Sequence, residues 1–196
     1  MMLLGSRLAQ MPVMGLQTGS ELATLKVPIV DPGTLNVIAY EVDGPLLDEK
    51  PAYLRLEDVR ELSDIGMIID SSEEFVLRGD VIQLDDILRL NFHLVGMDVR
   101  DEHRKKVGHI TDYSVETSTF SVQQLTVQRT LLQRLKESDL LIHRSQIIEI
   151  NDEAIVISSV AKISEPTVKD VGGSFVNPFR ASSTDPAPQA ITRDDN

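Results

Sequence analysis

The chain has 196 residues, enough for one or two domains, and its 41% apolar and 26% charged residues are typical of a globular protein. A formal net charge of −12 and only 4% aromatic residues, none of them Trp, argue against direct binding to DNA or to unpaired bases. The lack of Cys excludes disulfides, thiolate metal sites and cysteine catalysis, and it is typical of the reducing cytoplasm.

The N-terminal segment has neither the basic region nor the long apolar stretch of a signal peptide. All apolar runs are far shorter than the ~18 residues that suggest a membrane helix. We therefore expect a cytoplasmic protein that does not span a membrane.

Residues 1–78 show short apolar stretches that alternate with turn-forming residues. Polar turns are expected at Gln17–Glu21 and Asp31–Thr34, and a pair of short closing strands is expected around the turn at Ser63 and Asp64. The segments expected to be strands are Leu3–Val13, Asn36–Val42, Asp58–Leu62 and Ile65–Ile69. This spacing leaves no room for crossover helices, so it favours antiparallel pairing.

A helix is expected next, over Gly79–Leu90, with Asp80 as its N-cap. Its apolar positions fall on one face, at Val81, Leu84, Ile87 and Leu88. We expect this face to pack into the core rather than to form a groove for a partner.

The rest of the chain up to residue 163 repeats the order of the first part. Strands are expected at Leu94–Asp101, Ser121–Val127, Gln146–Ile150 and Ala154–Ile157, with turns at Asp101–Lys106 and Glu116–Thr119 and a second helix at Arg129–Ser138. Leu25–Val42 aligns without a gap on Ile110–Val127, 85 positions later, and Tyr53–Ile69 aligns on Leu141–Ile157, 88 positions later. Two ungapped blocks in the same order indicate an internal duplication.

The duplication predicts a mainly β protein of two tandem small antiparallel barrels with short helices. The expected divisions are a first barrel over residues 1–78, a helical linker over 79–93, a second barrel over 94–163 and a disordered tail over 164–196. The apolar residues at matching positions should form the core: Val37, Val42, Ile69, Val122, Val127 and Ile157.

No pattern of catalytic residues is found, and we expect neither an enzyme nor a bound cofactor or metal. The four histidines lack the i, i+4 spacing by which one helix presents two metal ligands. The segment His143–Ser145 brings His and Ser close in sequence, but we expect no catalytic triad there, because neighbouring residues of a strand point to opposite faces.

The second repeat resembles the PRC-barrel family over its whole length, and the first repeat resembles it more loosely. The motifs that carry the resemblance are GMDV (Gly96–Val99), VGHITDY (Val107–Tyr113), VQQLTV (Val122–Val127) and LLIHRSQIIEINDEAIVI (Leu140–Ile157). Family members include domains of ribosome maturation factors and of the photosynthetic reaction-centre H subunit. The resemblance implies a small β-barrel that serves as a binding module, and it carries over no functional residue.

Two functions fit these observations best, and a weaker third alternative, an enzyme with an unfamiliar site, would need a deep pocket with converging polar groups. The first is a non-catalytic adaptor that binds a protein partner, and the second is a ribosome-assembly or RNP-assembly factor that binds a ribosomal protein or a maturing small subunit. An acidic surface suits a basic protein partner. Residues expected to take part are the acidic Asp48, Glu49, Glu73 and Glu74 and, in the tail, Phe175 and Phe179. The two phenylalanines have two alternative roles, docking on the protein itself or on a partner.

Overall fold

The computed structural model describes residues 1–45, 47–129 and 139–158. By compactness the chain divides into Met1–Ala161 and Lys162–Asn196, so both repeats lie in one unit. The predicted boundaries at residues 78, 93 and 163 stay a prediction. The predicted tail and the predicted second helix beyond Arg129 lie outside the described residues, and Arg129 itself ends a strand.

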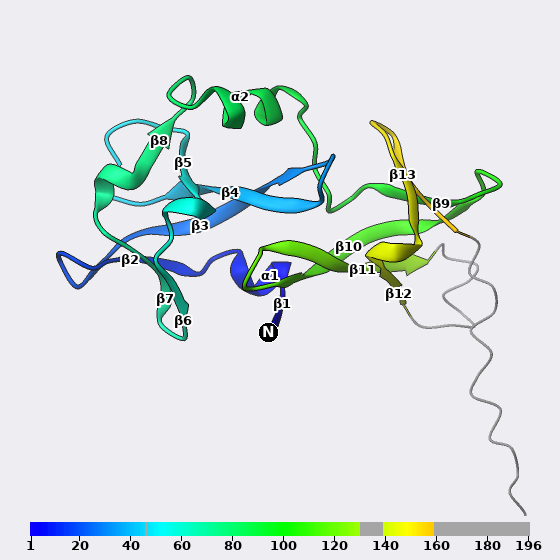
Figure 1. The fold of residues 1–196 in the computed structure, drawn as a ribbon, viewed down its shortest axis with the longest axis horizontal. Helices are drawn as coiled ribbons and strands as arrows, with labels where there is room; N and C mark the ends of the chain where they lie inside the picture. The colour runs from blue at the N-terminus through cyan, green and yellow to red at the C-terminus, as the bar shows by residue number, and fades with distance from the viewer. Residues whose placement is uncertain (46, 130–138, 159–196) are drawn as a thin grey trace, which may run out of the picture. The chain divides into compact units, whose positions relative to one another are not determined.

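Most regular elements of the first repeat are strands (Figure 1). Its elements are β1 (Met2–Leu4), α1 (Gly5–Leu8), β2 (Pro12–Gly15), β3 (Ser20–Asp31), β4 (Asn36–Asp43), β5 (Ala52–Arg55), the 3-10 helix η1 (Leu56–Asp58), β6 (Glu61–Ser63), β7 (Gly66–Ile69), the 3-10 helix η2 (Ser72–Glu74) and β8 (Phe75–Leu77). The predicted opening strand over Leu3–Val13 is therefore wrong in detail, because a helical turn interrupts it.

The helix α2 (Ile82–Arg89) leads into the second repeat. The elements that follow are β9 (Asp98–Asp101), β10 (Lys106–Glu116), β11 (Ser121–Arg129), β12 (Leu140–His143), the 3-10 helix η3 (Arg144–Gln146), β13 (Ile147–Ile150) and β14 (Ala154–Ile157). The segment expected to form a strand from Leu94 does so only from Asp98.

The two repeats share the same strand pairing. The hairpin of β3 and β4 pairs Val30 with Val37, and the hairpin of β10 and β11 pairs the matching Val115 with Val122. Both hairpins carry register shifts at matching places. Each repeat also closes with a parallel pair, β2 with β7 and β9 with β14. The structure thus confirms the duplication that the sequence predicts.

Among the described residues, the strands do not close into barrels. The pairing follows one path, β13-β14-β9-β10-β11-β4-β3-β2-β7-β6, whose two end strands do not pair with each other, and β1, β5, β8 and β12 pair beside it. The mainly β class is confirmed, whereas the closure of each repeat into a separate barrel is not.

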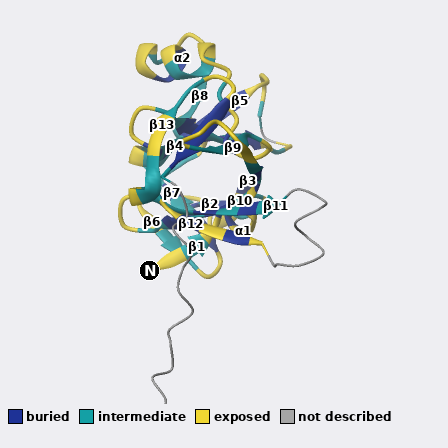
Figure 2. Ribbon diagram, turned by 90° about the vertical axis from the view of Figure 1, so that its right-hand side faces the viewer, coloured by how far each residue is buried: buried dark blue, intermediate teal, exposed yellow. Residues whose placement is uncertain are grey.

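The core follows the matched apolar positions (Figure 2). Each of the six residues predicted to be buried is exposed by 3% or less: Val37, Val42, Ile69, Val122, Val127 and Ile157. Val37 and Val42, like Val122 and Val127, are an odd number of residues apart, and both hairpins carry register shifts that interrupt strict alternation along the strand.

For the helix α2, the predicted N-cap is wrong and the predicted core-facing apolar stripe is confirmed in part. Asp80 does not cap it, because its carboxylate accepts the backbone N–H of Leu77 at 2.7 Å and so closes the turn after β8. The N-cap position is Val81. Leu84 is buried in a small cluster with Ala39 and Tyr53, as expected for a core-facing stripe.

Candidate binding groove at the junction of the repeats

The repeats meet through their matching hairpin turns. The backbone N–H of Val37 donates to the carbonyl of Phe120, and the N–H of Val122 donates to the carbonyl of Leu35, both at 2.9 Å. These bonds join positions that the duplication makes equivalent. Leu35 and Phe120 have nearly the same positive φ, 53° and 52°. The contact therefore has approximate two-fold symmetry within one chain.

A side chain of the second repeat reinforces the junction. Arg144 Nη2 donates to the carbonyl of Thr34 at 2.8 Å, and Arg144 Nη1 donates to Ser121 Oγ. Ser121 is itself paired across the junction with Asn36. Because hydrogen bonds from a charged donor are stronger than neutral ones, Arg144 helps to fix the two turns against each other.

The N-terminal strand crosses to the second repeat. β1 pairs antiparallel with β10, and Leu3 lies opposite Val115. Next along the chain, the N–H and hydroxyl of Ser6 donate to the two carboxylate oxygens of Asp112, at 3.0 and 2.6 Å. The first repeat thus contributes an outer strand to the sheet of the second.

Two buried tyrosines lie next to each other under this crossing. Burial raises the pKa of Tyr113 to about 12, and burial together with the neighbouring Tyr113 raises the pKa of Tyr40 well above 10. A Cβ added to Gly5 would overlap the ring of Tyr113. The close approach of backbone to ring therefore requires glycine.

A groove of about 730 Å³ opens beside the junction. Four segments form its walls: the turn of the second repeat, the start of β4, the stretch from β5 to β6, and one face of α2. Its apolar lining consists of Val37, Ile38, Leu56, Val59, Leu62, Val81, Leu84, Ile87 and Phe120. The α2 stripe thus lines a groove as well as packing into the core. The volume lies within the range of about 300–1,000 Å³ that is typical of ligand sites.

The positive charges around the groove are neutralised by neighbours. Arg55 Nε donates to Asp58 Oδ2 at 2.7 Å and its Nη1 donates to Glu57. Burial opposes the charge of Arg55, but these two carboxylates raise its pKa above the ordinary value. Arg60 Nη2 donates to Asp70 Oδ2 at 2.8 Å, and that hydrogen bond raises the pKa of Arg60.

Acidic side chains remain exposed at the rim. The side chain of Glu57 is 69% exposed although it is paired with Arg55, and Glu61 is exposed as well. Asp31, which also lines the groove, accepts the N–H of Gly33 and the hydroxyl of Thr34 and so shapes its own turn. The rim therefore presents carboxylates, not a site for anions.

A second hollow of about 570 Å³ lies on the other side of the junction. It is lined by Pro32 of the first repeat's turn, by residues 90–93 and 95–98, and by Ile150–Glu153 at the tip of the last hairpin. Pro32 matches Thr117 in the duplication, so the two hollows lie at related places. The second one lacks a wall formed by the face of a helix.

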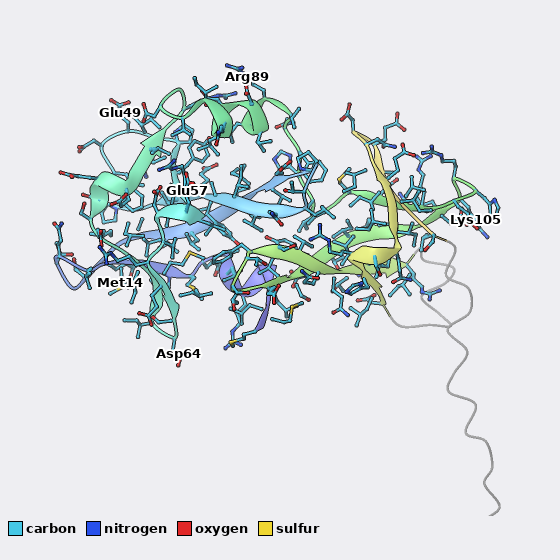
Figure 3. The ribbon with its side chains drawn as sticks, viewed as in Figure 1. Met14, Glu49, Glu57, Asp64, Arg89 and Lys105 are labelled. Carbon is cyan, nitrogen blue, oxygen red and sulfur yellow. The ribbon has the colours of Figure 1, made fainter. Side chains whose placement is uncertain are left out.

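None of the four acidic residues predicted from the sequence lines the groove. Asp48 and Glu49 are exposed in the loop before β5, whereas Glu73 and Glu74 belong to η2. β8 runs antiparallel to β5, so the two pairs lie near opposite ends of β5. Figure 3 shows Glu49 and Glu57 on different parts of the first repeat. Phe175 and Phe179 lie outside the described residues.

The one close pair of His and Ser has a structural role. His143 Nδ1 accepts the backbone N–H of Ser145 at 3.2 Å and lies 2.8 Å from its hydroxyl, and Gln146 Oε1 accepts the N–H of His143 at 2.9 Å. This is a capping box that starts η3. Among the residues that the structure describes, no group of three His, Asp or Glu side chains is placed to hold a metal ion.

The part of the chain that the structure describes has no helix long and apolar enough to cross a membrane. Comparison with protein-family models finds no match for this chain, and comparison with curated proteins finds no relative. The resemblance to PRC-barrels therefore stays a prediction.

The sequence reasoning missed the groove. One signal pointed to it: Leu35 and Phe120 are apolar residues at matching ends of polar turns, where a solvated hairpin would carry polar side chains. The walls from β6 and α2 are set by tertiary packing, which no local pattern reveals.

Proposed function

We propose that the protein is a non-catalytic adaptor, made of two PRC-barrel-like repeats, that binds a protein partner in the junction groove. The observation that carries the proposal is the groove itself. Half-buried apolar side chains from both repeats line it, among them Leu62 and Phe120, and acidic side chains stand at its rim. Apolar surface left partly exposed in this way gains free energy when a partner covers it.

The wider charge of the chain fits the same proposal. Residues 1–79 carry 13 Asp and Glu against 6 Lys and Arg, so a basic partner is attracted toward the first repeat. Asp48, Glu49, Glu73 and Glu74 then act by long-range steering and do not touch the bound segment. Phe175 and Phe179 are proposed as a second contact.

The acidic rim also favours a second candidate, a ribosome-assembly or RNP-assembly factor that holds a basic ribosomal protein. The two proposals share one binding site and differ in the identity of the partner. We propose the cytoplasm as the location for both, since a chain without Cys needs no oxidising compartment.

A blocked groove tests the proposal. Ser118 is exposed in the turn that lines the groove, so Ser118→Trp should fill the groove without disturbing the core. Gln17→Trp places the same side chain on an exposed turn away from the groove and is the matched control. Affinity purification of the three full-length proteins, followed by mass spectrometry, should show partners that are retained by wild type and Gln17→Trp and lost from Ser118→Trp.

Partners retained equally by all three proteins would contradict a role for the groove. Ribosomal proteins among the partners lost from Ser118→Trp would favour the assembly factor over the general adaptor.

A further inference from the structure

The strand β6 has a free edge. Within the described residues it pairs with β7 alone, through Leu62 opposite Met67 and Ser63 opposite Gly66, and it ends the path of the sheet. An edge strand presents unpaired N–H and C=O groups along one side, to which another extended chain can pair.

This edge borders the junction groove. Three consecutive residues, Arg60, Glu61 and Leu62, all line it. Arg60 stands just before β6, and Glu61 and Leu62 are its first two residues, so the groove reaches the start of this strand. A peptide that lies in the groove can therefore continue along the unpaired side of β6.

We infer that the groove takes an extended peptide segment of a partner, with alternating apolar and basic side chains, which adds to β6 as a further strand. The inference rests on the proposed function and specifies its ligand. In strand addition, backbone hydrogen bonds supply affinity and pockets for alternate side chains supply specificity.

The chemistry of the walls selects the side chains of this segment. Leu62 and Phe120, both half-buried, suit apolar side chains that point into the groove. Side chains of the peptide that point away from the groove meet the carboxylates of Glu57 and Glu61. The charge of Arg55 does not repel a basic peptide strongly, because Arg55 is already paired with Glu57 and Asp58. Lys or Arg at the outward positions is thus complementary in charge.

The test begins with selection from a displayed library of random ten-residue peptides on the immobilised full-length protein. Enrichment of peptides in which apolar residues alternate with Lys or Arg is expected. Their binding, measured by fluorescence polarisation, should be lost in Ser118→Trp and kept in Gln17→Trp. Glu61→Gln should weaken binding several-fold, and Glu21→Gln, an exposed acid outside the groove, is its matched control.

N-methylation of single backbone amides in the selected peptide tests strand addition without changing the protein. Methylation of each amide that faces β6, at alternate positions of the peptide, should weaken binding about two- to twelvefold, because it removes one backbone hydrogen bond. Methylation of the amides between them should have little effect.

The possible failures are distinguishable. If the selected peptides lose binding in Ser118→Trp, but N-methylation weakens binding to the same extent at every position, strand addition is wrong. The groove then remains a binding site. A library that yields no binder, or binders insensitive to Ser118→Trp, would overturn the inferred peptide ligand. Partner loss in the purification experiment would then still decide the adaptor proposal.

Discussion

The outer edges of the two long hairpins differ although their registers match. In the second repeat β1 pairs along β10, and the N–H of Thr117 donates to the carbonyl of Met1 at 2.9 Å. The matching edge of β3 pairs with no such strand within the described residues. Pro32 stands where Thr117 stands in the other copy and has no N–H to donate. Pro32 thus lacks the backbone hydrogen bond by which, in the second repeat, Thr117 holds the start of the chain beside β10.

The 3-10 turns after β5 and β12 differ in a related way. Arg55 and His143 occupy equivalent positions, yet Arg55 donates to acidic side chains whereas His143 accepts from the backbone of its own turn. Of these two turns, the first borders the larger groove and the second does not. The two repeats therefore share one pairing scheme, and local differences leave the larger groove, with its acidic rim, beside the first of these two turns.

The largest effects should come from matched core truncations. Leu54 and Ile142 are equivalent and both are fully buried. Leu54→Ala and Ile142→Ala should each lower the free energy of unfolding by about 2–5 kcal/mol, because each leaves a cavity. Urea unfolding followed by circular dichroism should show one transition in both variants, since both repeats lie in one compact unit.

Two separate unfolding transitions, of which only that of the mutated repeat moves to lower urea concentration, would contradict unfolding as one unit. Such a result would favour two independently folded repeats.

A smaller effect should follow from breaking the crossing of the N-terminal strand. Gly5→Ala places a methyl group where the Tyr113 ring lies, so β1 must shift away from β10. We expect a loss of about 1–3 kcal/mol in thermal or urea unfolding, as for other overpacked sites. The control is Ser20→Ala, which changes an exposed residue at the start of β3.

Unchanged stability in Gly5→Ala would show that the crossing contributes little to the junction.

The buried tyrosines should produce a pH effect. In the unfolded state a tyrosine has a pKa near 10. In the folded state the pKa of Tyr113 is about 12 and that of Tyr40 is also raised, so both side chains stay protonated at pH values where an unfolded tyrosine ionises. Stability is thus full below pH ~10 and falls as pH rises toward 12, by about 1.4 kcal/mol per pH unit for each such tyrosine. In a series of urea titrations, the stability of Tyr113→Phe should fall less steeply with pH over this range than that of wild type.

At pH 7 neither phenol hydroxyl makes a hydrogen bond of good geometry within the described residues, so Tyr40→Phe should change stability by less than about 1 kcal/mol. A larger loss would show that the hydroxyl makes a contact that this account lacks.

The smallest effect on stability is expected for the acidic surface. Neutralising Asp48, Glu49, Glu73 and Glu74 together should change stability by no more than about 0.5 kcal/mol per site, since the groups lie at the surface. The association rate of a basic partner should fall and should depend less on salt. Stopped-flow measurements at several salt concentrations check this, and a rate insensitive to salt in wild type would exclude steering.

The turns of the two long hairpins and the matched core positions were predictable, because the two copies repeat the same turn residues and the same apolar positions. Val37 and Val122 are the clearest case, since they occupy equivalent places in β4 and β11. The crossing of β1 was not predictable, because Met2–Leu4 carries no signal for its partner strand. Asp80 was assigned as a helix cap on sequence position alone, and the backbone N–H of Leu77 competes for its carboxylate.

The groove was hidden for the same reason as the crossing. Leu62, Phe120 and Ile87 are far apart in sequence and each is explained locally as a core residue. Only their meeting at the junction leaves them partly uncovered.

The most direct test of the central claim is hydrogen exchange of the full-length protein with and without the best selected peptide. Exchange should slow at Glu61–Ser63 and in the turn at 117–120, with no change at the equivalent residues 149–151 and 32–35. Equal protection in both repeats, or protection confined to other strands, would contradict a single binding groove at the junction.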